Sequence, residues 1–134
     1  MDSQRGSYLA YWGKARPPSG GEPPFHLLAY HCLDVAATGR VYLQRHPELL
    51  RWLARRTGLD TVATLDWISF WLALHDLGKF ATSFQNQRPD LLLQLQGRTS
   101  GKAYGGVRHD SLGELLWRMH LLARADVLGL QPQA

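Results

Sequence analysis

Apolar residues recur along most of the chain at the three- and four-residue spacing of helices that pack on one face. The pattern predicts helices over about 25–45, 47–57, 61–77, 89–96 and 110–128. No segment alternates between apolar and polar residues clearly enough to predict a strand. We therefore expect an all-α fold, an irregular bundle of five to six helices.

Residues at the predicted helix ends support these boundaries. Pro47 suits the first turn of the second helix, and Asp60 and Thr61 can cap the third. Gly78 is suited to ending that third helix. Its second half, residues 67–74, is apolar on almost every side, which predicts that it is the central buried helix of the domain.

The composition is that of a folded globular protein. The 134 residues fit one compact domain over 1–134, and 45% hydrophobic with 19% charged residues argues against disorder. No apolar stretch approaches the ~20 residues that cross a bilayer, and the first residues do not resemble a secretory signal. Cys32 is the only cysteine, which excludes an internal disulfide and a multi-cysteine zinc site. We therefore expect a cytoplasmic protein with no membrane span.

Basic residues exceed acidic ones in the whole chain. Fifteen Lys and Arg residues against eleven Asp and Glu residues give a formal net charge of +4. This excess is a modest bias toward polyanionic partners and does not identify one.

His75 and Asp76 follow each other at the end of the apolar third helix. An ionised carboxylate in apolar surroundings is costly unless something compensates its charge. A divalent cation would do so, because imidazole nitrogen and carboxylate oxygen suit manganese, iron, cobalt, nickel and zinc. Hydrogen bonds at a helix end would also compensate the charge, and for an isolated His-Asp pair this structural explanation is favoured.

Other polar residues shift the balance toward a metal site. Gly78 and Lys79 follow the pair, so the chain can turn there and a cation can reach a metal-bound phosphate. His31 lies in the first predicted helix and His109 beside the start of the last. From the residues alone, His31 can also be a hydrogen-bonded core histidine, and His109 an exposed helix-start residue. Asp34 can either orient a ligand ring or pair with a surface Arg or Lys.

Four stretches in the same order resemble one known family. They are residues 11–14, residues 26–37, residues 73–80 and the pair Phe84-Gln85. Together they closely resemble the HD nuclease domain of the Cascade-recruited helicase-nuclease of type I CRISPR systems. The sequence of these stretches is most like subtype E. The resemblance extends over most of the chain and implies an HD-superfamily fold.

The resemblance also implies a site. It identifies His31, His75, Asp76 and His109 as metal ligands and places Lys79 against the scissile phosphate, with Lys79 and Asp76 as the catalytic residues. The family site holds two divalent metal ions, for which Mn, Co, Ni, Fe or Mg are the candidates. Such a pair can activate water and stabilise the leaving oxygen of a phosphodiester. The implied substrate is single-stranded DNA, which a helicase module feeds into the site from an R-loop bound by the Cascade complex.

The chain departs from the family pattern after His109. The family continues with an adjacent histidine pair and a later aspartate, whereas here His120 and Asp126 match no family motif. We therefore expect an N-terminal part of the nuclease domain, truncated before the downstream ligands and without the helicase module. The alternative is a catalytically silent truncated HD module that binds Cascade or another CRISPR component.

Overall fold

A computed structural model describes the chain over three ranges, 8–17, 21–101 and 105–124. The chain forms two compact units. We name Trp12–His75 the hairpin unit, and the residues up to Tyr11 together with those from Asp76 onward the carboxy-terminal unit. The described residues form six α-helices and one small hairpin, which confirms the predicted helical fold class.

The hairpin unit begins with two short antiparallel strands, β1 (Trp12–Ala15) and β2 (Phe25–Leu27). The backbone N–H of Arg16 donates to the carbonyl oxygen of Pro24 at 2.9 Å, just beyond the paired residues. The expectation that the chain has no strand was therefore wrong, and the first helix begins three residues later than Phe25. Strands of four and three residues are too short to show a period-two pattern, and their pairing is a contact between distant residues.

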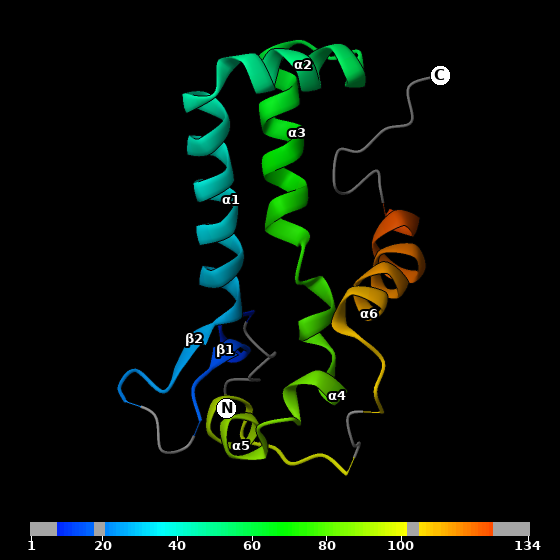
Figure 1. The fold of residues 1–134 in the computed structure, drawn as a ribbon. Helices are drawn as coiled ribbons and strands as arrows, with labels where there is room; N and C mark the ends of the chain where they lie inside the picture. The colour runs from blue at the N-terminus through cyan, green and yellow to red at the C-terminus, as the bar shows by residue number, and fades with distance from the viewer. Residues whose placement is uncertain (1–7, 18–20, 102–104, 125–134) are drawn as a thin grey trace, which may run out of the picture. The chain divides into compact units, whose positions relative to one another are not determined.

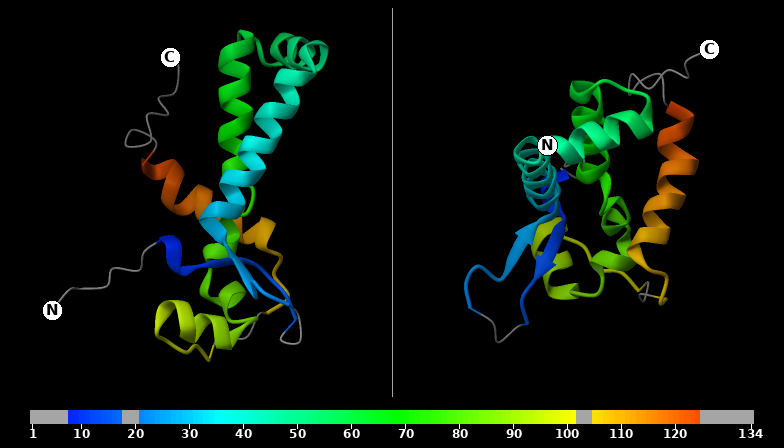
Figure 2. Two further views of the ribbon diagram at one scale, coloured as in Figure 1. Left: turned by 90° about the vertical axis from the view of Figure 1, so that its left-hand side faces the viewer. Right: turned by 45° about the horizontal axis from the view of Figure 1, so that its top comes forward.

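Three helices follow, α1 (Leu28–Arg45), α2 (Pro47–Thr57) and α3 (Thr61–Leu74). Figure 1 shows α1 and α3 running side by side in opposite directions, with α2 lying across their ends. The left view of Figure 2 shows the same arrangement. This arrangement brings the first turn of α1 and the last turn of α3 to the same end of the unit.

The end of α2 and the start of α3 follow local signals. Gly58 ends α2 with a φ of 74°, a conformation that favours glycine, and its N–H donates to the Ala54 carbonyl at 3.0 Å. Asp60 caps α3 as predicted, because its side chain accepts a hydrogen bond of 2.7 Å from the Ala63 N–H.

Asp60→Ala is expected to lower the free energy of unfolding by about 1 kcal/mol, because an N–H in the first turn of α3 loses its acceptor. Urea denaturation followed by circular dichroism measures this change. Asp60→Asn keeps an acceptor oxygen and serves as the matched control, with an expected midpoint close to that of the unchanged chain. An equal loss in both variants would contradict the capping role.

α3 is less buried than its apolar sequence predicts. Only Thr64 and Leu65 of this helix are buried, whereas Trp67 and Trp71 are 49% and 40% exposed. The expectation of a central buried helix was therefore wrong, because within the hairpin unit only α1 and α2 pack substantially against α3. The helix also ends at Leu74, before the His-Asp pair.

The carboxy-terminal unit consists of short elements. They are the 3-10 turns η1 (Tyr8–Ala10) and η2 (Leu77–Phe80), the helices α4 (Thr82–Gln85), α5 (Pro89–Gln96) and α6 (His109–Leu116), the π-helical turn η3 (Trp117–Leu121) and the 3-10 turn η4 (Leu122–Arg124). The prediction of α5 was correct, whereas α4 was not predicted. The predicted last helix is α6 continued by two irregular turns, and its end beyond residue 124 lies outside the described residues. No described helix has the length and apolarity needed to cross a membrane.

Candidate metal centre

His75 and Asp76 lie in the turn that joins α3 to η2. His75 is the residue after the last α3 residue and keeps a helical conformation, whereas Asp76 leaves it. The ring Nδ1 of His75 lies 2.7 Å from the Leu72 carbonyl oxygen, which can only accept, so Nδ1 carries the proton. In the neutral ring this leaves the lone pair on Nε2, which is the state that a metal ligand needs.

His31 lies beside His75 within the hairpin unit. It belongs to the first turn of α1, is 9% exposed, and its ring centroid lies 5.3 Å from that of His75. Strand β1 packs against this turn, since an added Cβ on Gly13 would lie 3.3 Å from the Cβ of His31. The close packing holds the His31 side chain at one end of the unit.

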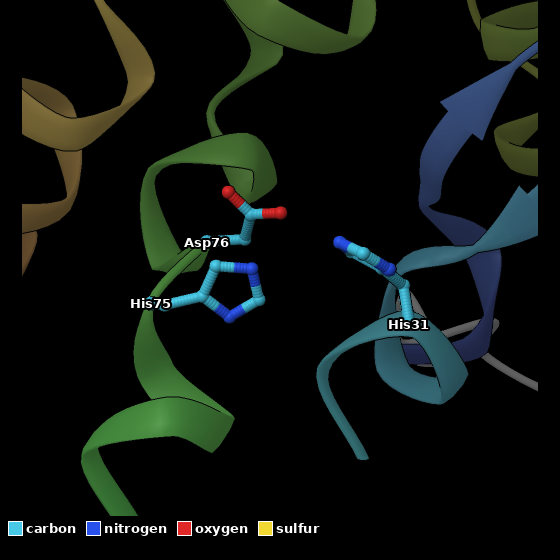
Figure 3. A group of neighbouring side chains, drawn as sticks. All are labelled: His31, His75 and Asp76. Atoms are coloured by element: carbon cyan, nitrogen blue, oxygen red, sulfur yellow. The ribbon is translucent and has the colours of Figure 1, made fainter. Parts of the chain in front are cut away.

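A group of three possible ligands is drawn in Figure 3. Among the residues that the structure describes, His31, His75 and Asp76 could together hold a metal ion, each with one ligand atom. His31 and His75 are neighbours in the hairpin unit, and the peptide bond joins Asp76 to His75. Two imidazoles and a carboxylate form a donor set that suits a divalent transition metal.

Asp76 is 3% exposed, and both of its carboxylate oxygens face nitrogen atoms in the carboxy-terminal unit. Lys79 Nζ lies 2.7 Å from Oδ2, and the Lys79 side chain is 12% exposed. His109 Nε2 lies 3.2 Å from Oδ1. A buried carboxylate is costly unless it is paired, so these contacts help to compensate the charge of Asp76.

The contact between Asp76 and His109 also fits a shared metal. Two ligand atoms about 2.1 Å from one ion, at angles between octahedral and tetrahedral values, lie about 3.0–3.4 Å apart. The observed separation of Oδ1 and Nε2 is 3.2 Å. The residues present therefore fit a divalent ion bound by Asp76 and His109.

Phe84 and Gln85, which the sequence marks only by their resemblance to the family, support the site. The Phe84 ring in α4 contacts both side chains that pair with Asp76, with its centroid 5.5 Å from Lys79 Nζ and 5.7 Å from the centroid of the His109 ring. Gln85 is fully buried and donates from Nε2 to the Lys79 carbonyl oxygen at 2.8 Å. Gln85 supports the site because it is buried, and the spacing of residues in the sequence does not predict which glutamine is buried.

Other polar residues considered from the sequence have different neighbours. Asp34 pairs with His26 Nε2 at 3.0 Å, so neither of the two roles considered for Asp34 is observed. His120 is exposed on η3, and Asp126 lies outside the described residues. Beside His109, the Arg108 guanidinium hydrogen-bonds to Asp110 and lowers the pKa of that carboxyl below its ordinary value.

A cavity of about 570 Å³ opens on the hairpin unit beside His31. It follows one side of α1 as far as Tyr42, and Leu72 of α3 contributes to its wall. His26 and Lys14 also line it. The volume is within the range of sites that bind small molecules.

Comparisons with known proteins identify the family of the chain. Residues 12–131 match the family described as Cas3, HD domain. The CRISPR-associated endonuclease/helicase Cas3 of Escherichia coli (strain K12) is 36% identical over 89 residues, which are 66% of this chain and 10% of that protein. The protein of the same name from Thermus thermophilus is 35% identical over 113 residues, 82% of this chain and 12% of that protein.

The chain thus spans about a tenth of the length of the curated relatives it matches. No solved structure gives a significant match. The family match covers residues 12–131 and contains His31, His75, Asp76 and His109. The family resemblance noted in the sequence is confirmed, and the chain belongs to the Cas3 HD nuclease domain family of CRISPR systems.

Proposed function

We propose that the chain contributes the metal-dependent nuclease site of a type I CRISPR helicase-nuclease, which hydrolyses phosphodiesters of single-stranded DNA. The observation that carries this proposal is the buried Asp76 carboxylate, which follows His75 in the chain and lies 3.2 Å from His109. The relatives named above are endonuclease/helicases, which agrees with this chemistry.

His31, His75, Asp76 and His109 would hold the divalent metal. When bound, the metal supplies Lewis acidity that activates water and stabilises the leaving oxygen. His75 presents Nε2 because its Nδ1 proton is held by the Leu72 carbonyl. Asp76 supplies the negative charge, and the burial of this carboxylate limits competition from water.

Lys79 would bind the scissile phosphate. In the structure its ammonium lies against Asp76 and over the ring of Phe84. The flexible lysine side chain would pair with a phosphate oxygen of the substrate, and this pairing would stabilise negative charge in the transition state. Loss of one such donor typically lowers a rate by about 10²–10³-fold.

We further propose that a helicase module and the Cascade complex deliver the DNA strand to this site. The cavity beside His31 supports an approach along α1, because its volume of about 570 Å³ accommodates a nucleotide. Lys14 lines this cavity and would attract the phosphate backbone.

A pull-down of the chain with Cascade in the absence of metal tests the proposed partner. The absence of association would count against Cascade as a partner.

The nuclease test uses the purified chain, labelled single-stranded DNA and Mn²⁺ or Co²⁺. We expect metal-dependent cleavage that His75→Ala reduces by at least about 100-fold, because a ligand of the site is removed. His120→Ala changes an exposed histidine on η3 and is the matched control, with unchanged cleavage expected. Equal cleavage by the His75→Ala and unchanged chains would refute the catalytic proposal.

A further inference from the structure

Gly78 of η2 lies in unusually close contact with the backbone of α6. A Cβ atom on Gly78 would lie 1.7 Å from the His109 carbonyl oxygen and 2.5 Å from the backbone nitrogen of Gly113. Both separations are far below van der Waals contact, and both neighbours are backbone atoms that cannot rotate away. Only a hydrogen atom fits at this position while α6 remains where it is.

The backbone conformation of Gly78 does not by itself require glycine. Its φ lies outside the left-handed region, unlike those of Gly58, Gly97 and Gly106. An alanine could adopt the same conformation without strain. The requirement for glycine is therefore the space occupied by α6.

The contact lies next to the pair of His109 and Asp76. η2 starts one residue after Asp76, and α6 starts at His109 itself. Within the carboxy-terminal unit, α6 packs against η2 more extensively than against any other element. Gly113 is one helical turn after His109, and its own Cβ position would lie 3.1 Å from the Gly78 nitrogen. Two glycines thus set the distance between the two backbones.

We propose that Gly78 and Gly113 are positioning residues for the metal site, because their close contact holds the His109 imidazole at the Asp76 carboxylate. A side chain on either glycine would push the start of α6 away from η2. The separation of His109 Nε2 and Asp76 Oδ1, now 3.2 Å, would then exceed that of two ligands sharing one ion. The role in metal binding rests on the proposed function, whereas the role in the contact between His109 and Asp76 does not.

The first test measures the contact without a metal. In the metal-free full chain, the NMR signal of the His109 ring is expected to shift on Asp76→Asn, because the imidazole loses its charged partner. In the Gly78→Ala background, the same change is expected to leave the signal unmoved. A shift of equal size in both backgrounds overturns the proposal, regardless of whether the chain binds a metal.

The second test measures Mn²⁺ binding by calorimetry. Gly78→Ala is expected to weaken binding about 10- to 100-fold, the range found when residues that orient a metal ligand are changed. The double variant Gly78→Ala/His109→Ala should bind Mn²⁺ no more weakly than His109→Ala alone, because each change removes the same ligand, the His109 imidazole. Additive losses in the double variant would overturn the proposal. If the unchanged chain binds no Mn²⁺, the proposed function is refuted. The metal-free NMR result then decides the positioning role of Gly78.

Gly113→Ala provides a milder variant that remains informative if Gly78→Ala fails to fold. Alanine favours a helix more than glycine, so thermal stability should rise or stay equal while Mn²⁺ affinity falls several-fold. A merely structural role would move both quantities together and would overturn the proposal. Gly101→Ala, where no atom lies within 4 Å of the added Cβ, is the control for an inert substitution. Gly97→Ala, at a φ of 64°, should lower stability without lowering affinity.

Discussion

Asp76→Asn is expected to abolish divalent metal binding and to reduce cleavage of single-stranded DNA to background. Asparagine has almost the same shape as aspartate but lacks the negative charge that both a metal and Lys79 require. Asp76 is 3% exposed and Lys79 is 12% exposed in its side chain, so this largely buried lysine would lose its ion pair with Asp76. We expect the metal-free variant to lose about 3 kcal/mol of unfolding free energy, since breaking a buried ion pair leaves one charge uncompensated.

Calorimetry with Mn²⁺ and urea denaturation without metal measure the two expected effects of Asp76→Asn separately. Asp66→Asn is the matched control, because Asp66 is a carboxylate of α3 that is 60% exposed and pairs with Arg40. Exposed ion pairs contribute about 0–1 kcal/mol, so neither affinity nor stability should change much in the control. Mn²⁺ binding that survives Asp76→Asn with less than a tenfold loss would contradict the assignment of Asp76 as a ligand.

Helices whose ends carry local signals were predicted correctly from the sequence. Pro89 occupies the first position of α5 and Gly97 ends it in the left-handed conformation, so both boundaries depend on residues inside the segment. The same holds for α2 between Pro47 and Gly58. These signals act over one helical turn and do not depend on the rest of the chain.

Boundaries that depend on distant residues were not predicted. The β1–β2 hairpin depends on pairing between residues about 10 to 15 positions apart, and no apolar alternation marks it. The prediction extended α3 to Leu77, because the apolar run continues to the His-Asp pair and Gly78 resembles a helix end. Gly78 instead lies inside η2, where the closeness of α6 requires a residue without a side chain.

For the candidate site, the sequence identified residue types but not their pairing. His75, Asp76 and Lys79 are neighbours in the chain, so their proximity follows from the motif. The placement of His109 on Asp76 could not be deduced, because α4 and α5 lie between η2 and α6 in the chain. The roles of His31, His75, Asp76 and His109 as ligands stay predictions until a metal is measured.

Lys79→Met is expected to separate metal binding from cleavage. In the structure Lys79 Nζ holds Oδ2 of Asp76 at 2.7 Å, so a metal that uses this oxygen must first displace the ammonium. Charge-assisted hydrogen bonds contribute about 1.5–3 kcal/mol, so removing this competitor should tighten Mn²⁺ binding about tenfold or more. Methionine keeps the length of the side chain and packs well on an aromatic ring, so the contact with Phe84 is preserved.

Cleavage at saturating Mn²⁺ should nevertheless fall about 100-fold in Lys79→Met, because the positive charge that would pair with the scissile phosphate is gone. Calorimetry and single-turnover cleavage of labelled single-stranded DNA measure the two quantities on the same preparation. Lys79→Arg keeps the charge and is the control, with no gain in metal affinity expected. Weaker Mn²⁺ binding by Lys79→Met would show that the lysine stabilises the metal site rather than competing with the metal for the Asp76 carboxylate. Cleavage equal to that of the unchanged chain would exclude Lys79 from phosphate binding.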